Sequence, residues 1–256
     1  MADERRRVLL ERLIDHAALF PPASMSMEEA LAEDRAARAG DHAWMLDRFV
    51  CPASRLADLD GLDAPVSVVL DGPLDAPADA IEVRLSQPRP APAELIRTAG
   101  ALRELSPEVY FELLLDESWR DSVPAAIGAI AAVGGRVKLR CGGELVPSVE
   151  QVALVLLACS DAGVVMKATA GLHHPLRRDG EHGFLNFLCA AGLAHARNAG
   201  APLLQHALES EALGDLPLAD LSADEIRSTR RNLFKGFGSC SWREPVEDLQ
   251  ALGVLS

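Results

Sequence analysis

Aromatic residues are scarce in this sequence, at 4% of its 256 positions, although 49% of the positions are hydrophobic. The core must therefore consist mainly of leucine, valine, alanine and isoleucine, which usually fill a parallel sheet that helices cover. No apolar run reaches the length needed to cross a bilayer, so we expect no membrane partner. The length is typical of one barrel-sized domain.

Paired cysteine motifs and nucleotide-binding motifs are also missing. The five cysteines form no C-x-x-C pair, which argues against a disulfide framework or a structural zinc site. Neither a G-x-G-x-x-G nor a P-loop sequence occurs, so we expect no nucleotide cofactor, and no other cofactor is indicated. The charged N-terminus does not resemble a secretory signal, and we expect a cytoplasmic location.

Basic residues are fewer than acidic residues. The sequence holds 25 lysines and arginines against 38 acidic residues, for a formal net charge of −13. Such an acidic surface repels phosphate backbones, so a nucleic-acid partner is not expected. The sequence does not indicate an oligomeric state, and a homo-oligomer is among the states that it allows.

Short β-like runs alternate with longer helical patterns along the chain. The clearest strands are predicted at 44–50, 66–71, 80–85, 109–115, 136–141 and 163–169, with weaker ones at 202–206 and 234–240. Helices are predicted at 3–14, 26–39, 93–105, 118–133, 148–162, 183–198 and 244–252. About eight β-then-α units favour a TIM-type (β/α)8 barrel. We interpret residues 1–256 as a single domain with an N-terminal helix.

Charged side chains interrupt the apolar strands near their ends, where the catalytic groups of a barrel gather. They are Arg48, Glu82, Arg84, Glu112, Lys138, Arg140 and Lys167. Side chains alternate between the two faces of a strand. The pairs that share a face are Glu82 with Arg84, Lys138 with Arg140, and Lys167 with Thr169.

These charges have two interpretations, because buried charge is unfavourable unless it is paired or used. One is a set of internal ion pairs with the two glutamates. Cations outnumber carboxylates in the group, however, which favours a pocket for a small anionic ligand such as a phosphate or a carboxylate. Arg48, Arg84 and Arg140 are then the residues that hold the anion.

Lys167 ends the apolar run Val164-Val165-Met166. Lost hydration and a neighbouring cation such as Lys138 would both lower the pKa of Lys167 and leave a free amine to attack a carbonyl group. The alternative is a structural lysine that pairs with Glu82 or Glu112. The residues alone do not decide between the two.

The motif Lys167-Ala-Thr-Ala-Gly follows, after one helix, the segment Val137-Lys-Leu-Arg-Cys-Gly-Gly-Glu-Leu145. With Ile14-Asp15-His16 near the start, these motifs resemble the class I 2-deoxyribose-5-phosphate aldolase family. The resemblance implies a barrel lyase whose Schiff-base lysine falls on Lys167. The family's catalytic acid would fall on Glu82 or Glu112, and its second lysine on Lys235 or Lys138.

The sequence departs from the family directly after this motif, where Leu172-His173-His174-Pro175 replaces a Gly-Gly-Ala-Thr segment. We therefore expect an anionic carbonyl substrate, a phosphorylated sugar or a keto acid, without fixing which. His173 or His174 would carry protons, since a histidine pKa of about 6.5 suits that role. Adjacent residues of an extended loop point in opposite directions, so at most one of the two faces the site. Further predicted substrate contacts are His182, Asn186, Lys235, Gly238 and Ser239.

Two other functions stay open on the sequence. A metal-dependent barrel hydrolase would use His16, His173 and a glutamate as ligands, although no specific metal-binding spacing occurs. A non-catalytic barrel would bind an anionic metabolite without forming an imine. Our prediction is a Schiff-base lyase that uses no metal.

Overall fold

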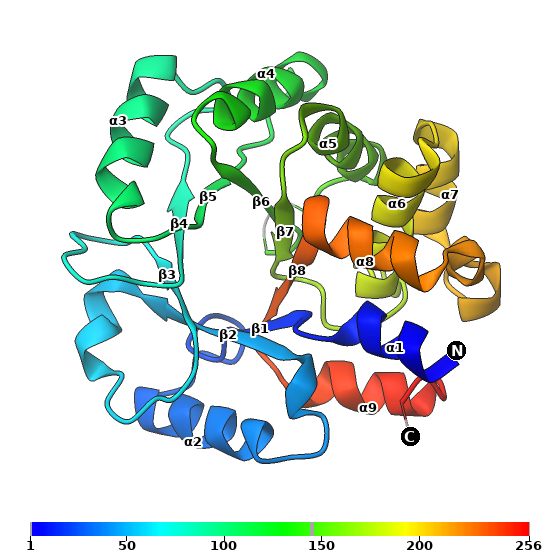
Figure 1. Cartoon of the computed structure of the whole chain (residues 1–256), viewed down its shortest axis with the longest axis horizontal. Coiled ribbons are helices and arrows are strands. Elements are labelled where there is room, and N and C mark those ends of the chain that lie inside the picture. The colour runs from blue at the N-terminus through cyan, green and yellow to red at the C-terminus, as the bar shows by residue number, and fades with distance from the viewer. Residues whose placement is uncertain (1, 144–145, 256) are drawn as a thin grey trace.

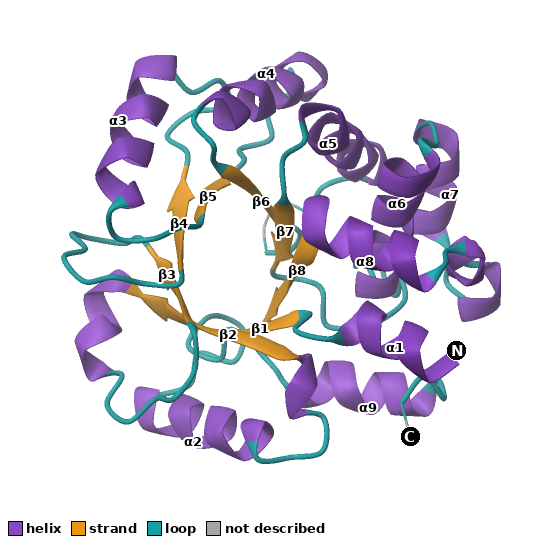
Figure 2. Cartoon of the chain, in the orientation of Figure 1, coloured by secondary structure: helices purple, strands orange, loops and turns teal. Residues whose placement is uncertain are grey.

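The computed structural model describes residues 2–143 and 146–255. Within this part of the chain, eight parallel strands close into a barrel in sequence order, and β8 pairs back onto β1. The strands form an inner ring and the helices an outer ring (Figures 1 and 2). The predicted TIM-type barrel is confirmed. Glu144 and Leu145, at the end of one aldolase-like segment, lie outside the described residues.

The strands are β1 (Ile14–His16), β2 (Leu46–Pro52), β3 (Val66–Val69), β4 (Ala80–Arg84), β5 (Val109–Glu112), β6 (Arg136–Arg140), β7 (Met166–Thr169) and β8 (Phe234–Ser239). The helices are α1 (Ala2–Leu10), α2 (Met27–Arg38), α3 (Pro92–Arg103), α4 (Trp119–Ala132), α5 (Val149–Ala162), α6 (Phe184–Arg197), α7 (Ala201–Glu209), α8 (Ala223–Asn232) and α9 (Arg243–Ala251). None of the described helices combines the length and the apolar character that crossing a bilayer requires.

Local capping explains where several helices begin and end. Ser26 accepts a hydrogen bond from the backbone N–H of Glu29, and the Glu29 carboxylate accepts one from the Ser26 N–H. Ser148 opens α5 with the same reciprocal arrangement. Gly163 then ends α5 at a φ of 64°, a left-handed conformation that glycine adopts without a Cβ penalty.

The predicted strand at 202–206 is wrong, because these residues belong to α7. Pro202 lies in the first turn of that helix, where its fixed φ and missing N–H are tolerated. Leu204 and Leu208, four residues apart, are both buried. The remaining strand of the barrel is instead β1, a segment of three residues at the end of the predicted helix 3–14.

The main apolar core lies between the strands and the surrounding helices. On β6, Val137 and Leu139 are buried in this core, as is Met166 on β7. The alternate residues Lys138 and Lys167 point into the barrel, where they form ion pairs with residues of other strands. The barrel interior is therefore charged, and its open end is the natural place to look for a site.

Candidate active site

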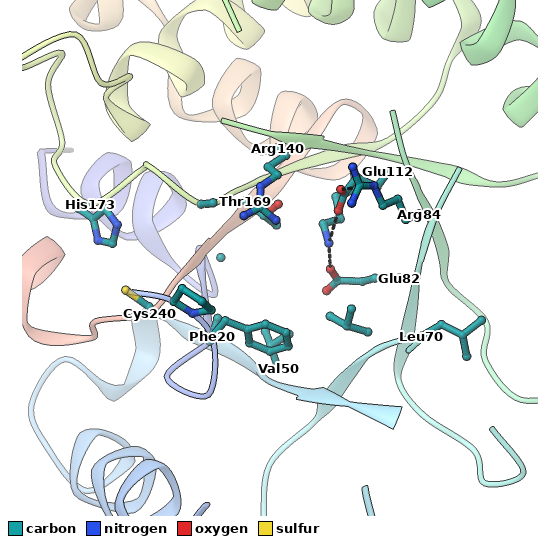
Figure 3. A pocket seen from close by; sticks show the side chains of 16 residues that line it. Phe20, Val50, Leu70, Glu82, Arg84, Glu112, Arg140, Thr169, His173 and Cys240 are labelled. Atoms are coloured by element: carbon teal, nitrogen blue, oxygen red, sulfur yellow. Dashed lines mark ion pairs between the residues drawn. The ribbon is translucent and has the colours of Figure 1, made fainter. Parts of the chain in front are cut away.

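A pocket of about 290 Å³ opens at the carboxyl ends of the strands, where TIM barrels carry their active sites. This volume is near the lower limit of small-molecule sites. Glu82, Glu112 and Lys138 line the pocket. Arg140 and Thr169 line one side of it (Figure 3). Eight residues predicted to form the site line this one cavity: Glu82, Arg84, Glu112, Lys138, Arg140, Thr169, His173 and Gly238.

The floor cluster consists of Asp15, Glu82, Glu112, Lys138 and Lys167. Lys138 Nζ lies 2.8 Å from Glu82 Oε2 and 2.8 Å from Glu112 Oε2. Lys167 Nζ lies 2.8 Å from Asp15 Oδ2 and pairs with the other carboxylate oxygen of Glu82. Glu82 therefore bridges the two ammonium groups.

The strand register explains why these residues meet. Lys138 of β6 is directly opposite Lys167 of β7 on one side and Glu112 of β5 on the other. Glu82 comes from β4 and reaches both lysines from across the barrel interior, and Asp15 comes from β1. Closure of the barrel brings Asp15 within reach of Lys167, which is 152 positions away in the sequence.

The two lysines differ in their access to the pocket. Lys138 is 7% exposed and lines the cavity, whereas Lys167 is 1% exposed and lies beneath it. Lys167 Nζ also lies 3.4 Å from Ser67 Oγ and 5.0 Å from the ring centroid of Tyr110. A ligand in the pocket therefore meets Lys138 before it meets Lys167.

The carboxylates of the floor cluster control the pKa values of both lysines. Burial by itself lowers the pKa of Lys167, but Asp15 and Glu82 outweigh it, and the pKa rises above 10.5. Burial also opposes the charged form of Lys138, whose pKa is nevertheless raised by Glu82 and Glu112. The pKa of Glu82 is lowered, because the two lysines outweigh the effect of its own burial.

The predicted low pKa of Lys167 is therefore wrong for the ligand-free protein. The prediction assumed that Lys138 would be its dominant charged neighbour and that cations would outnumber carboxylates inside the barrel. Glu82 lies between the two lysines, and Asp15 adds a further carboxylate to the cluster. Both lysines are held as ammonium ions in this arrangement.

Two predicted substrate-binding cations, Arg48 and Lys235, lie at the opposite, amino-terminal end of the barrel. The closed-end cluster consists of Arg48, Glu108 and Arg136: Glu108 lies 2.8 Å from Arg48 Nη2 and 2.9 Å from Arg136 Nη2. Lys235 Nζ lies 3.9 Å from Asp47 Oδ2. Neither Arg48 nor Lys235 lines the pocket.

The other predicted arginines do line it. Arg140 Nε donates a hydrogen bond to the carbonyl oxygen of Gly142 at 3.1 Å, and no ion pair of Arg140 occurs among the described residues. Gly142 itself packs so closely on Gly171 that a Cβ would lie 2.7 Å from the Gly171 nitrogen. Arg84 is 73% exposed along its side chain, and its Nε lies 3.8 Å from Glu112 Oε1. Arg140 is thus better placed than Arg84 to receive an anion.

The adjacent histidines separate, as expected for an extended loop. His173 lines the pocket, and its Nδ1 lies 3.0 Å from Glu244 Oε2. His174 faces a different surface hollow, with its Nδ1 2.6 Å from Asp248 Oδ2. Only His173 of this pair can contact a ligand in the pocket.

His182 and Asn186 are buried outside the pocket lining. Asn186 Nδ2 donates hydrogen bonds of 2.7 Å to the carbonyl oxygens of Ala207 and Ser210. His182 Nε2 lies 2.7 Å from the carbonyl oxygen of Pro147. These side chains hold loops and helices together, and the structure does not bring them to the site.

The end of β8 contributes to the pocket through only one of its two predicted residues. Gly238 lines the cavity and is opposite Thr169 of β7. Ser239 is buried, and its Oγ donates a hydrogen bond of 2.7 Å to the carbonyl oxygen of Ser241. Ser239 therefore stabilises the turn that follows β8.

The ligand set of the metal-dependent alternative is not brought together. His16 points outward, with its Nδ1 3.0 Å from Asp34 Oδ1 of α2, while His173 contacts Glu244 at the pocket. Within residues 2–143 and 146–255, no group of three or more histidine, cysteine, aspartate or glutamate side chains is arranged to hold a metal ion.

The sequence reasoning missed two parts of the site. The motif Ile14-Asp15-His16 draws attention to Asp15, but its ion pair with Lys167 was not predicted. The apolar side of the pocket, which includes Phe20, Val50 and Leu70, was not predicted. Apolar residues at a strand end look the same in sequence whether they face a ligand or the core.

No protein-family model matches the sequence, and no curated protein matches it significantly. Among solved structures, a tetrameric deoxyribose phosphate aldolase from Aeropyrum pernix covers 98% of each chain, with 15% identity and a TM-score of 0.56. A candidate deoxyribose-phosphate aldolase from Toxoplasma gondii ME49 covers 97% of this chain and 93% of its own, with 12% identity and a TM-score of 0.47. The likeness to the Aeropyrum protein agrees with the resemblance seen in the sequence and shows the shared fold.

Proposed function

We propose that this protein is a Schiff-base lyase that acts on a small anionic carbonyl compound. The observation that carries the proposal is Lys138, a buried primary amine between Glu82 and Glu112 on the floor of the pocket. An amine beside carboxylates that can accept and return protons is what imine chemistry needs. The aldolase that shares this fold supports the proposal.

In this proposal Lys138 forms the imine. The sequence motif favours Lys167, whereas access to the pocket favours Lys138, because only Lys138 lines the cavity. Lys167 would then act from below, as a positioning residue that keeps Glu82 ionised and in place.

The first chemical step is the loss of a proton from Lys138, because an ammonium group has no lone pair. Oε2 of Glu82 and Oε2 of Glu112, each 2.8 Å from Nζ, are close enough to accept it. The neutral Nζ then adds to the carbonyl carbon and gives a carbinolamine. Protonation of its hydroxyl group and departure of one water leave a protonated imine.

Cleavage follows because the protonated imine accepts the electron pair of a carbon–carbon bond. A base removes the proton of the hydroxyl group on the second carbon from the imine carbon. The bond between this carbon and the carbon next to the imine then breaks, and a second carbonyl compound leaves. The enamine that remains gains a proton on carbon, and one water hydrolyses the imine to return the free amine. His173, held by Glu244, is our candidate for the proton carrier, and Arg140 for the anion contact.

Borohydride trapping tests this proposal. The protein is incubated with a panel of aldehydes, 2-oxo acids and sugar phosphates, reduced, and measured by intact mass. We expect one reduced adduct per chain, which Lys138→Met abolishes. The matched control is Lys235→Met, which removes a partly buried lysine from the other end of the barrel and should keep the adduct.

The panel also separates the alternatives. If anionic compounds raise the melting temperature but none gives an adduct, the protein is an anion-binding barrel and the lyase proposal is wrong. If Lys235→Met loses the adduct while Lys138→Met keeps it, the imine forms at the amino-terminal end of the barrel and the proposed role of Lys138 is wrong.

A further inference from the structure

The side of the pocket opposite Arg140 is lined by apolar side chains. Figure 3 shows Phe20 and Val50 across the cavity from Arg140 and Thr169. We call this side the apolar wall: it comprises Phe20, Val50, Val69 and Leu70, with Ala17 and Pro21 beside them. The charged side chains of the pocket come instead from β4, β5 and β6, and His173 comes from the loop after β7.

This division conflicts with a sugar phosphate as the ligand. A chain of hydroxyl groups would lie partly against Val50, Val69 and Leu70, which offer no hydrogen-bond partner from their side chains. Hydroxyl groups that give up water without a replacement weaken binding. A hydrocarbon arm in the same place gains affinity, because its apolar surface leaves water.

The charged side favours a carboxylate over a phosphate. Arg140 makes no ion pair among the described residues, so its guanidinium is available to bind an anionic group, carboxylate or phosphate, in a forked contact. Arg84 lies 3.8 Å from Glu112, so part of its charge is already compensated. The carboxylates of Glu82 and Glu112 also face the pocket and repel a dianionic group more than a monoanionic one.

The spacing along β6 limits where that carboxylate can be. Lys138 and Arg140 are successive inward-facing residues, so their Cα atoms are about 6.6 Å apart. Both side chains are long enough to reach neighbouring atoms of one small ligand. A carboxylate directly attached to the carbonyl carbon satisfies both contacts.

We propose that the substrate is a 2-oxo acid with a hydrocarbon arm, and for cleavage a 4-hydroxy-2-oxo acid. This inference rests on the proposed imine at Lys138. The C3–C4 bond breaks, the proton of the C4 hydroxyl passes to a base, and C3 gains a proton. The products are an aldehyde that carries the hydrocarbon arm and pyruvate, and the two together contain all the atoms of the substrate.

Binding of acids that cannot form an imine tests the ligand class separately from the chemistry. The probes are 2-hydroxy-4-methylvalerate, lactate and glycerol 3-phosphate, measured by calorimetry. Each added buried carbon is worth about fourfold in affinity. We therefore expect 2-hydroxy-4-methylvalerate to bind at least about tenfold more tightly than either of the other two.

Leu70→Asn should remove most of this preference, because it makes the apolar wall polar at a half-buried position. Leu203→Asn, at an exposed position of α7, is the matched control and should leave the preference unchanged. A melting curve of each variant confirms that it is folded before its affinity is compared.

The outcomes distinguish this inference from the proposed function. Tighter binding of glycerol 3-phosphate, or no binding of 2-hydroxy-4-methylvalerate, would overturn the substrate class. If 2-hydroxy-4-methylvalerate binds as expected but 4-methyl-2-oxovalerate gives no borohydride adduct, the substrate class is supported and the imine is wrong. Adducts formed preferentially with sugar phosphates would support the imine and overturn the substrate class.

Discussion

Both ends of the barrel interior contain buried charged groups, yet the pocket opens at only one of them. At the closed end, Glu108 lies between Arg48 and Arg136, which satisfy its carboxylate from two sides. At the open end, Glu82 lies between Lys138 and Lys167 in a similar way. The two ends differ in their access to a ligand, because a cavity of about 290 Å³ is lined by Lys138 at the open end.

Buried charge in a barrel strand therefore does not by itself identify a site. Arg48 and Arg140 both lie in strands of the barrel, but Arg48 is the third residue of β2 and Arg140 is the last residue of β6. The strand around Arg48 was predicted at 44–50, two residues earlier than its observed bounds. That shift turns a residue near the strand end into one near the strand start.

The largest effect is expected for Glu82→Gln, which removes the carboxylate that bridges the two lysines of the open end. We expect the free energy of unfolding at pH 7 to fall by about 3 kcal/mol, because buried ammonium groups lose a partner. Since the pKa of Glu82 is lowered from 4.5, its contribution is present above pH 4.5 and is lost as the pH falls through its folded value.

Urea denaturation of Glu82→Gln and of the wild-type protein at pH 7 and at several lower pH values measures this. The stability difference should be largest at pH 7 and should shrink in acid. Equal stability of the two proteins at pH 7 would show that the floor cluster does not support the fold.

The second change acts at the closed end. Glu108→Gln should lower the free energy of unfolding by about 2 kcal/mol, because Arg48 and Arg136 lose their shared carboxylate. The yield of the borohydride adduct should stay unchanged at a temperature where the variant is folded. A folded Glu108→Gln variant without an adduct would mean that the two ends do not work independently.

The smallest effect on stability is expected for a substitution inside the pocket. Arg140→Gln should weaken the binding of a carboxylate ligand by about tenfold or more, because a charge-assisted hydrogen bond is lost. Its free energy of unfolding should change by less than about 0.5 kcal/mol, as for a surface substitution. Arg84→Gln, which lies beside Glu112, is the matched control in the same calorimetric titration and should weaken binding less.

Much of the fold could be predicted from the sequence, because strand and helix patterns are local. The exceptions have local causes too. β1 is only three residues long and holds Asp15 and His16, so it has no strand pattern. The apolar pair Leu203-Leu204 in α7 resembles a strand when the helix start at Pro202 is overlooked.

The site was predictable where strand alternation decides it and not where distant strands meet. Alternation indicates that Lys138 and Arg140 share a face, and the pocket contains both. The contact between Lys167 and Asp15 spans 152 positions, and together with Glu82 it reverses the expected direction of the pKa shift of Lys167. No pattern within one strand carries that information.

The position of the covalent adduct shows directly which lysine forms the imine. Wild-type protein is reduced with borohydride in the presence of the tightest-binding 2-oxo acid, digested, and analysed by peptide sequencing in a mass spectrometer. We expect the reduced ligand on Lys138, at the floor of the open end. An adduct on Lys167 or Lys235 instead, or no adduct at saturating ligand, would contradict the claim that Lys138 is the imine-forming amine.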